Sequence, residues 1–156
     1  MIVAIATVLV AWFTGAPNPE LPADKIPASV MTTLTAKFPR AKIDKWSKEK
    51  EEGKDVYDIE FRQGEQKFEA DIFADGTLHN WERQIPQSDL PPAVVQTVNK
   101  RFPGAVLKEI MAVTDVKNGV ERLEGYEVVI QRAVRKDVEM TIAPDGRILE
   151  GPGSGK

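Results

Sequence analysis

The sequence predicts an α+β fold of two tandem repeats, in which each repeat is one helix packed on an antiparallel sheet of about four strands. Three short motifs occur twice in the same order, and after each predicted helix the spacing of apolar residues changes from about four to two. The motifs are Ile26-Pro27, Phe38-Pro39-Arg40-Ala41 and Asp75-Gly76 in the first copy, and Leu90-Pro91, Phe102-Pro103-Gly104-Ala105 and Asp145-Gly146 in the second. Their separation grows from 64 to 70 residues, which predicts a longer polar loop in the second copy.

The chain of 156 residues has the length of one domain, or of two small repeats that share a core. We divide it into a signal peptide, a proline-rich linker, two repeats and a tail without fixed structure. These segments are residues 1–16, 17–23, 24–87, 88–150 and 151–156.

The N-terminus is typical of a secretory signal. Residues 2–13 form an uncharged apolar run, and the small residues Thr14 and Ala16 suit a cleavage site. As a helix, residues 2–16 would span about 22 Å, less than the roughly 30 Å of a bilayer core. Since no Lys or Arg precedes the run, an uncleaved anchor and a buried strand stay open as alternatives. We expect a periplasmic or secreted protein that touches a membrane only through an uncleaved N-terminal segment.

A helix is predicted over residues 27–37 and again at the matching place in the second copy. Pro27 suits a first helical turn, where its missing N–H would have no partner. Phe38 ends the helix because the residue before a proline is pushed out of the helical region. The apolar stripes, spaced by four, are Ile26, Val30, Leu34 and Phe38, and then Leu90, Val94, Val98 and Phe102.

Strands are predicted where apolar and polar residues alternate, because such strands bury one face of a sheet. The expected strands are 41–48, 57–61, 68–72 and 78–83, followed by 106–113, 125–131, 138–143 and 147–150. The charged segment 49–55 and the polar segment 114–125 are predicted to be loops, and each Asp-Gly pair a turn.

The order helix, Phe-Pro-x-Ala, strands, Asp-Gly, final strand resembles the PepSY-like family, also described as β-lactamase-inhibitor-like exported bacterial proteins. The resemblance covers residues 24–150. It implies a tandem α+β fold, export, and a role in binding or inhibiting another protein. The matching positions are structural, so the resemblance carries no inhibitory residue over to this chain.

Composition argues against several classes of function. A net charge of −3 and a pI near 5.3, with basic residues scattered among acids, argue against nucleic-acid binding. The absence of cysteine removes disulfides, thiolate metal sites and a nucleophilic thiol.

No catalytic constellation is present in the sequence. His79 is the sole histidine, and we expect it to be a partly exposed strand residue rather than a ligand or an acid–base group. Hydrolysis by a serine needs an adjacent base, and no Gly-x-Ser-x-Gly motif occurs. We therefore predict a protein that is not an enzyme, without catalytic residues, metal ligands or a cofactor.

An acidic sheet face in the first repeat is the first candidate binding surface. If Phe61 pairs with Phe68 in a hairpin, the residues between the apolar ones meet across the strands. The opposed acids are Asp58 with Asp71 and Glu60 with Glu69. Like charges directly opposite are unfavourable, so these four need compensation. Basic side chains such as Lys45 or Arg83, a basic protein partner, and a hard cation such as calcium are the open explanations.

Two tryptophans provide the second candidate surface. Trp46 and Trp81 lie in predicted outer or edge strands, and tryptophan is enriched at interface hot spots. Packing in the core or between the repeats is the other interpretation for both, and the repeat favours it because their counterparts in the second copy are not aromatic. For Tyr57 and Tyr126, which occupy the same repeat position, we expect burial in the core.

We therefore expect a non-enzymatic binding module that regulates or inhibits an extracytoplasmic hydrolase through its outer sheet face. The predicted partner-binding residues are Trp46, Asp58, Glu60, Glu69, Asp71 and Trp81. The alternative is a cell-envelope module that senses a small ligand or a cation.

Overall fold

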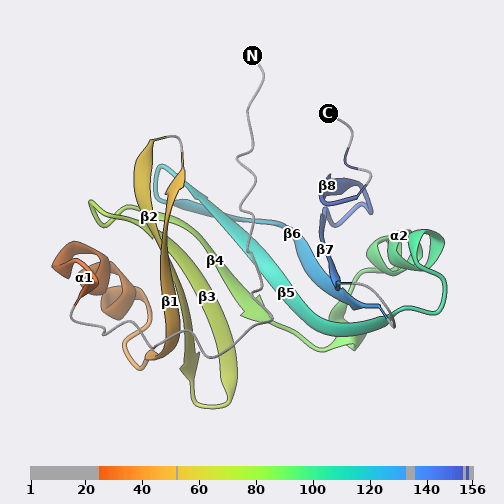
Figure 1. Ribbon diagram of the computed structural model, residues 1–156, viewed down its shortest axis with the longest axis horizontal. Helices are drawn as coiled ribbons and strands as arrows, with labels where there is room; N and C mark the ends of the chain where they lie inside the picture. Colours follow the sequence, from red (N-terminus) through yellow and green to blue (C-terminus); the bar gives the residue numbers. More distant parts are fainter. Residues whose placement is uncertain (1–24, 52, 133–135, 153, 155–156) are drawn as a thin grey trace. The chain divides into compact units, whose positions relative to one another are not determined.

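The computed structural model describes residues 25–51, 53–132, 136–152 and 154, and within them it shows an α+β fold (Figure 1). The predicted signal peptide and linker lie outside the described residues. The first helix and its strands are α1 (Ala28–Lys37), β1 (Lys42–Glu51), β2 (Lys54–Gln63), β3 (Gln66–Phe73) and β4 (Leu78–Gln84). A short 3-10 turn, Gln87–Asp89, leads to α2 (Pro92–Arg101), β5 (Val106–Lys117), β6 (Val120–Gln131), β7 (Val138–Ile142) and β8 (Ile148–Glu150).

The described strands follow chain order in one eight-stranded sheet, with antiparallel pairing wherever a register is resolved. The sequence predicts an antiparallel sheet of about four strands in each repeat. In the structure β4, the last strand of the first repeat, pairs with β5, the first strand of the second, so the described strands belong to one sheet. The register of β4 and β5 places Asn80 opposite Asp115 and Gln84 opposite Met111.

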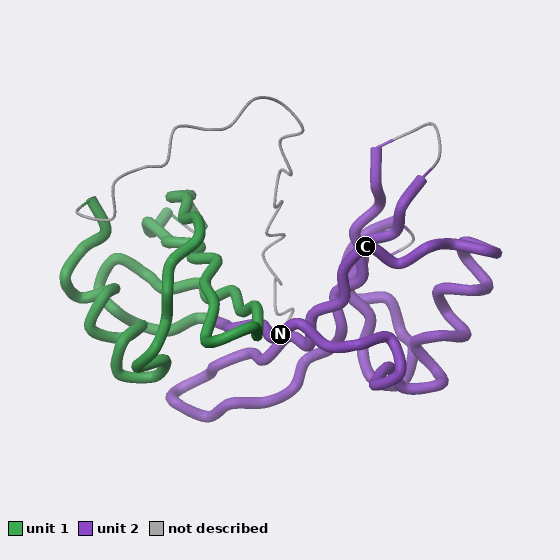
Figure 2. Tube along the Cα trace, turned by 90° about the horizontal axis from the view of Figure 1, so that it is seen from below, with its two compact units in different colours: residues 1–79 green, residues 80–156 purple. Residues whose placement is uncertain are grey.

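The chain forms two compact units, unit 1 (residues 1–79) and unit 2 (residues 80–156) (Figure 2). They divide inside β4, between His79 and Asn80, and not in the connection at residues 87–88 where the repeats are expected to meet. The pairing of β4 with β5 explains why most of β4 belongs to unit 2.

Both predicted long loops are instead strand. Residues 49–51 and 54–55 lie in β1 and β2, where the charged loop is expected. In the second copy, β5 and β6 continue to a two-residue turn at Asn118 and Gly119, with φ of 53° and 75°. Positive φ at both residues is the type I′ geometry that Asn-Gly favours. The additional residues of the second copy therefore lengthen a hairpin.

The core of unit 1 lies between α1 and the inner face of β2 and β3. Phe38, at the end of α1, packs on the rings of Phe61 and Phe68, with centroids 4.7 and 5.4 Å away. In unit 2 the corresponding cluster consists of buried aliphatic side chains from α2 and the sheet. Tyr57 is buried, as predicted, and Tyr126 is partly buried against the core of unit 2.

The same hydrogen bond fixes the Asp-Gly turn to the helix in both units. Thr33 Oγ1 donates to the carbonyl of Gly76, and Thr97 Oγ1 donates to that of Gly146, each at 2.6 Å. Both glycines have positive φ, and a Cβ at either position would lie 3.0 Å or less from a helix carbonyl. The turn can therefore approach the helix only with glycine at that place.

Candidate functional site

The sheet face of unit 1 opposite to α1, which we name the carboxylate face, carries four acids. The register pairs Asp58 with Asp71 and Glu60 with Glu69, as the sequence predicts. Because side chains alternate along a strand, these acids point away from the face on which Phe61 packs. The predicted juxtaposition of like charges is confirmed.

Two lysines form ion pairs with these acids. Lys45 Nζ lies 2.8 Å from Glu60 Oε1, as one of the sequence-based explanations anticipates. Lys67 Nζ lies 2.9 Å from Glu69 Oε1 and 3.6 Å from Glu60 Oε2. Lys67 is 9% exposed, so these ion pairs are formed largely away from water and are screened less than surface pairs.

Asp58 is the carboxyl group that this crowding affects most clearly. Burial raises its pKa well above that of an ordinary aspartate, and the negative charges of Asp71, Glu69 and Glu60 raise it further. Lys45 acts in the opposite direction but does not offset these effects. The carboxylate face therefore holds a proton more readily than a solvated acid does.

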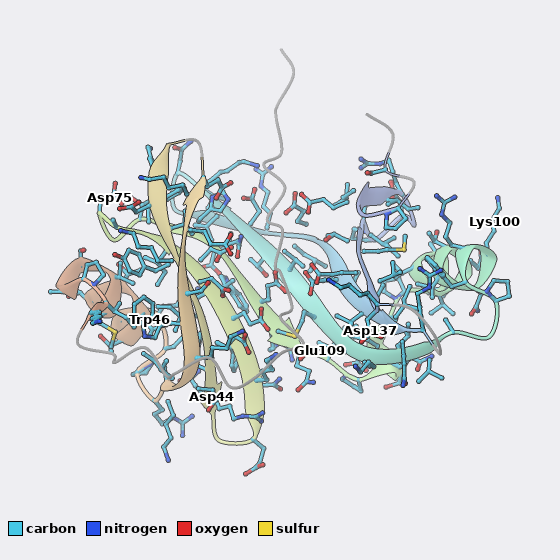
Figure 3. All side chains as sticks on the ribbon, in the orientation of Figure 1. Asp44, Trp46, Asp75, Lys100, Glu109 and Asp137 are labelled. Atoms are coloured by element: carbon cyan, nitrogen blue, oxygen red, sulfur yellow. The ribbon has the colours of Figure 1, made fainter. Side chains whose placement is uncertain are left out.

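Trp46 is not on the carboxylate face. It pairs with Ile59, stacks on Tyr57 with centroids 5.9 Å apart, and is 8% exposed, on the side of β1 toward α1 (Figure 3). A bulge between Ile43 and Lys45 is the physical reason. The additional residue lets Ile43 and Trp46 share the inner face although three positions separate them.

Trp81 does not join the carboxylate face either. It lies in unit 2, pairs with Thr114, and its Nε1 donates to Glu121 Oε2 at 3.2 Å. Two positions along β4, Arg83 pairs with Ala112, which packs against the core beneath α2. Trp81 is therefore on the helix side of the sheet of unit 2.

The groups that could support hydrolysis have structural contacts. His79 is partly exposed, as predicted; its Nε2 lies 3.4 Å from Glu51 Oε1 and its ring 5.2 Å from that of Phe73. The hydroxyl of Ser29 donates to the carbonyl of Ala74 at 2.6 Å. Within the described part of the chain, no group of three or more His, Asp or Glu residues has an arrangement that could hold a metal ion.

Unit 2 also carries acids on the sheet face opposite to its helix, whereas the sequence predicts an acidic face for the first repeat. Two rows of paired residues cross this face of unit 2. In one row the neighbours are Met111, Glu127, Thr141 and Glu150. In the other they are Glu109, Val129 and Glu139. Met111 and Val129 are buried between these acids. Apolar residues thus separate the acids of unit 2, whereas those of unit 1 lie directly opposite each other.

Three features of the structure were not predicted from the sequence. Lys67 lies two residues before Glu69 and four before Asp71 in β3, and this spacing predicts that all three share one face of the sheet. The Asn118-Gly119 pair is a strong hairpin signal. Thr33 and Thr97 occupy the same position in the two helices, but a helical threonine rarely signals a turn contact.

Comparison with protein families gives two matches to one family model. The model, described as "putative beta-lactamase-inhibitor-like, PepSY-like", matches residues 12–80 and again residues 55–150. No curated protein matches the sequence. Among the described helices, none combines the length and apolar character needed to cross a membrane.

Several solved structures share the fold. A DUF2874 family protein from Bacteroides uniformis has a TM-score of 0.60 and 16% identity, covering 81% of this chain and 88% of that one. A protein from Bacteroides eggerthii, described as a putative periplasmic protein, has a TM-score of 0.61 and 14% identity over 81% and 87%. A BLIP-like protein from Bacteroides fragilis has a TM-score of 0.54 and 15% identity over 88% and 92%. At these identities the likeness shows the fold alone.

Proposed function

The chain belongs to the PepSY-like, beta-lactamase-inhibitor-like family, and from that premise we propose that it is a non-catalytic binding module of the cell envelope whose carboxylate face recognises a basic protein partner. Its two repeats supply the scaffold, and the acids of unit 1 supply the recognition. The description of one structural relative as periplasmic supports an exported location.

The observation that carries this proposal is the direct opposition of two acid pairs on one sheet face. Asp58 opposes Asp71 and Glu60 opposes Glu69. The negative charges of Asp71, Glu69 and Glu60 raise the pKa of Asp58, and Lys45 does not offset them. Like charges directly opposite across strands destabilise a sheet. A sheet that needed these positions only for folding would be more stable with neutral residues there. An arginine or lysine of a partner would relieve the repulsion.

The accessible part of this face is its β1 side. The Lys45 side chain is 55% exposed, whereas Asp71 is 8% exposed and the side chains of Glu60 and Glu69 are 14% exposed. A partner would therefore displace or surround Lys45 and approach Glu60, and Glu69 opposite it, from that side. We propose an extracytoplasmic hydrolase as the partner class, because the family is described as beta-lactamase-inhibitor-like and a β-lactamase is a hydrolase.

The test is affinity capture from a cell-envelope extract with three versions of the protein. These are the wild type, Glu69→Gln, which keeps the size of the side chain but removes its charge, and Glu65→Gln as a control. Glu65 is exposed in the β2–β3 turn. We expect a partner that the wild type and the control retain, that Glu69→Gln loses, and that elutes at raised ionic strength. Equal capture by all three versions would contradict the use of this face.

The hydrolase assignment needs a separate assay with purified components. Wild-type protein is titrated into a panel of β-lactamases and envelope proteases while substrate turnover is followed. The expected result is a concentration-dependent loss of turnover for at least one enzyme, weakened by Glu69→Gln and unchanged by Glu65→Gln. Full activity of every captured enzyme at saturating protein would show binding without inhibition.

A further inference from the structure

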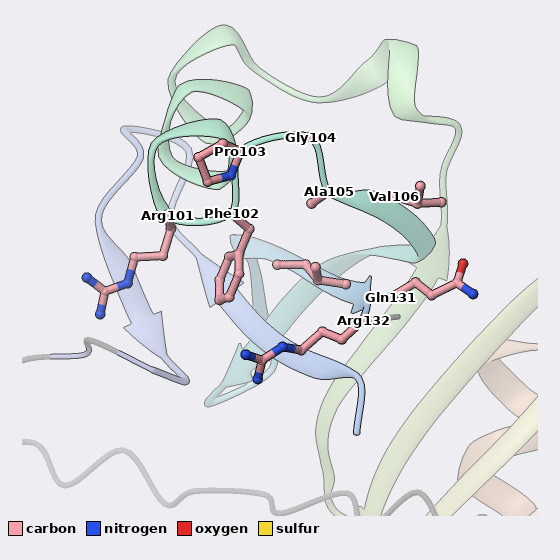
Figure 4. A pocket seen from close by; sticks show the side chains of 9 residues that line it. Arg101, Phe102, Pro103, Gly104, Ala105, Val106, Gln131 and Arg132 are labelled. Carbon is pink, nitrogen blue, oxygen red and sulfur yellow. The ribbon is translucent and has the colours of Figure 1, made fainter. Parts of the chain in front are cut away.

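Unit 2 contains an open pocket where α2 meets the sheet. It lies beneath the turn that follows α2, has a volume of about 640 Å³, and includes Phe102, Val106, Ile130 and Arg132 in its lining (Figure 4). Volumes of roughly 300–1,000 Å³ are usual for sites that bind small molecules. The pocket lies entirely in unit 2 and has no part in the carboxylate face.

The pocket occupies the place that aromatic rings fill in unit 1. The matching registers, Tyr57 with Ile72 and Tyr126 with Ile142, align the central hairpins of the two units. On this alignment Ile130 corresponds to Phe61 and Val138 to Phe68. In unit 1, Phe38 is 5% exposed because both rings pack on it.

The smaller residues of unit 2 leave the equivalent ring, Phe102, partly exposed at the pocket. Phe102 therefore presents an aromatic surface that its counterpart in unit 1 buries. The difference is encoded at two positions, and the turn itself has the same Phe-Pro-x-Ala sequence in both units.

The charge of the pocket is opposite to that of the chain. Arg101 and Arg132 line it, and none of the described residues in its lining carries a carboxylate. Arg101 Nε and Nη2 both donate to the carbonyl of Pro152, at 3.2 and 3.0 Å, so the chain itself holds this guanidinium and Arg132 is the arginine that a ligand would meet. Asp137, which accepts from the backbone N–H of Arg132, is paired with Lys108 at 2.7 Å.

We propose that this pocket binds a small amphipathic carboxylate, with its apolar tail against Phe102 and Val106 and its head on Arg132. A guanidinium matches a carboxylate in geometry as well as charge, so the head should prefer the two-pronged contact with arginine. The partly exposed ring of Phe102 and the exposed side chain of Val106 would lose contact with water when the tail covers them, which favours binding. This inference does not depend on the proposed partner face.

The test is NMR titration of the full chain with octanoate, with 1-octanol and acetate as matched probes for the tail and the head. We expect octanoate to shift the amides of Ala105, Val106 and Arg132 saturably, to bind at least tenfold tighter than 1-octanol, and acetate to produce no shift. Equal affinity for 1-octanol, shifts confined to other regions, or no shift at millimolar octanoate would overturn the proposal.

Two variants separate the pocket from unspecific apolar binding. Ile130→Phe restores the ring of unit 1 and should abolish octanoate binding, while Arg132→Gln should weaken it at least fivefold. Arg40→Gln, in the corresponding turn of unit 1, is the control and should bind like the wild type. Undiminished binding by folded Ile130→Phe would contradict the assigned place. If that variant does not fold, undiminished binding by Arg132→Gln would contradict the role of the charge.

Discussion

The two units share the hydrogen bonds and helix ends that build them, and they differ in the side chains around this common frame. Thr33 and Thr97 make the same 2.6 Å hydrogen bond to the Asp-Gly turn, and Phe38 and Phe102 end the two helices in the same way. Around this frame, unit 1 has buried rings and opposed acids, and unit 2 has aliphatic residues and an open pocket. Repeated positions therefore build the fold, and the features that we propose for binding lie at positions that differ.

The largest expected effect tests the difference in packing. Phe38→Ala should lower the free energy of unfolding by about 3–5 kcal/mol, because the buried ring leaves a cavity between Phe61 and Phe68. Phe102→Ala should cost less, about 1–3 kcal/mol, since part of that ring already contacts water. Urea unfolding followed by circular dichroism compares the two. Equal losses would show that the pocket does not loosen the packing of Phe102.

The shared turn gives the next effect. Gly146→Ala should cost more than the 1–2 kcal/mol or so of a left-handed backbone alone, because its Cβ would lie 2.8 Å from the carbonyl of Ala93. Gly119→Ala is the control, with φ of 75° and nothing within 4 Å of an added Cβ. Thermal melting of both variants measures the difference. A Gly146→Ala variant as stable as Gly119→Ala would show that the turn can move away from the helix.

The matched threonines should give smaller and equal effects. Thr33→Val and Thr97→Val each remove one hydrogen bond to a turn carbonyl and should each cost about 0.5–1.5 kcal/mol. Thr35→Val removes a bond within the helix from an exposed side chain and should be close to neutral. Urea midpoints provide the comparison. A clear inequality between Thr33→Val and Thr97→Val would break the equivalence of the two turns.

The smallest expected effect concerns two aspartates of β2. Replacing Asp58 and replacing Asp55 should change the stability at pH 7 in opposite directions. The raised pKa of Asp58 means that the folded state binds a proton more tightly than the unfolded state. Its ionisation therefore lowers stability as pH rises from about 4 through the folded pKa. Asp58→Asn should stabilise the protein at pH 7 by a few tenths of a kcal/mol or more, and by less at pH 4.

Asp55 is the matched control on the same strand. Hydrogen bonds from Lys48 and Lys50 lower its pKa, so its ionised form contributes stability that is lost as pH falls through that value. Asp55→Asn should therefore slightly destabilise the protein at pH 7. Thermal melts of both variants across the pH range check the two signs, and the same sign for both would contradict the difference between their surroundings.

The strand register that pairs the acids could be predicted from the sequence. The sheet faces on which Trp46 and Trp81 lie could not. Strict alternation from Tyr57 to Phe61 permits only one pairing that keeps the acids out of the core. The bulge between Ile43 and Lys45 interrupts the alternation of β1, and no residue there signals it. The extension of β5 and β6 could not be predicted from apolar spacing, because the apolar residues of the segment 114–125 are Val116, Val120 and Leu123 and show no period of two.

The pocket could have been inferred from the repeat once the hairpins were aligned. Ile130 and Val138 stand where unit 1 has Phe61 and Phe68, and that loss of two rings is visible in the sequence. The position of the Arg101 side chain could not be inferred from the sequence. Its guanidinium is fixed by the carbonyl of Pro152, which is 51 residues distant in the chain.

The most direct test of the carboxylate face is a pH titration of the aspartate side-chain carbons by ¹³C NMR. Asp58 should titrate well above the ordinary aspartate value of about 3.9, while Asp55, Asp75 and Asp137 should titrate below it. That result would show that burial and the neighbouring carboxylates outweigh Lys45 at Asp58, as the account of the carboxylate face requires. An Asp58 pKa at or below 3.9 or so would show that the face is already neutralised, and would contradict its role in binding a basic partner.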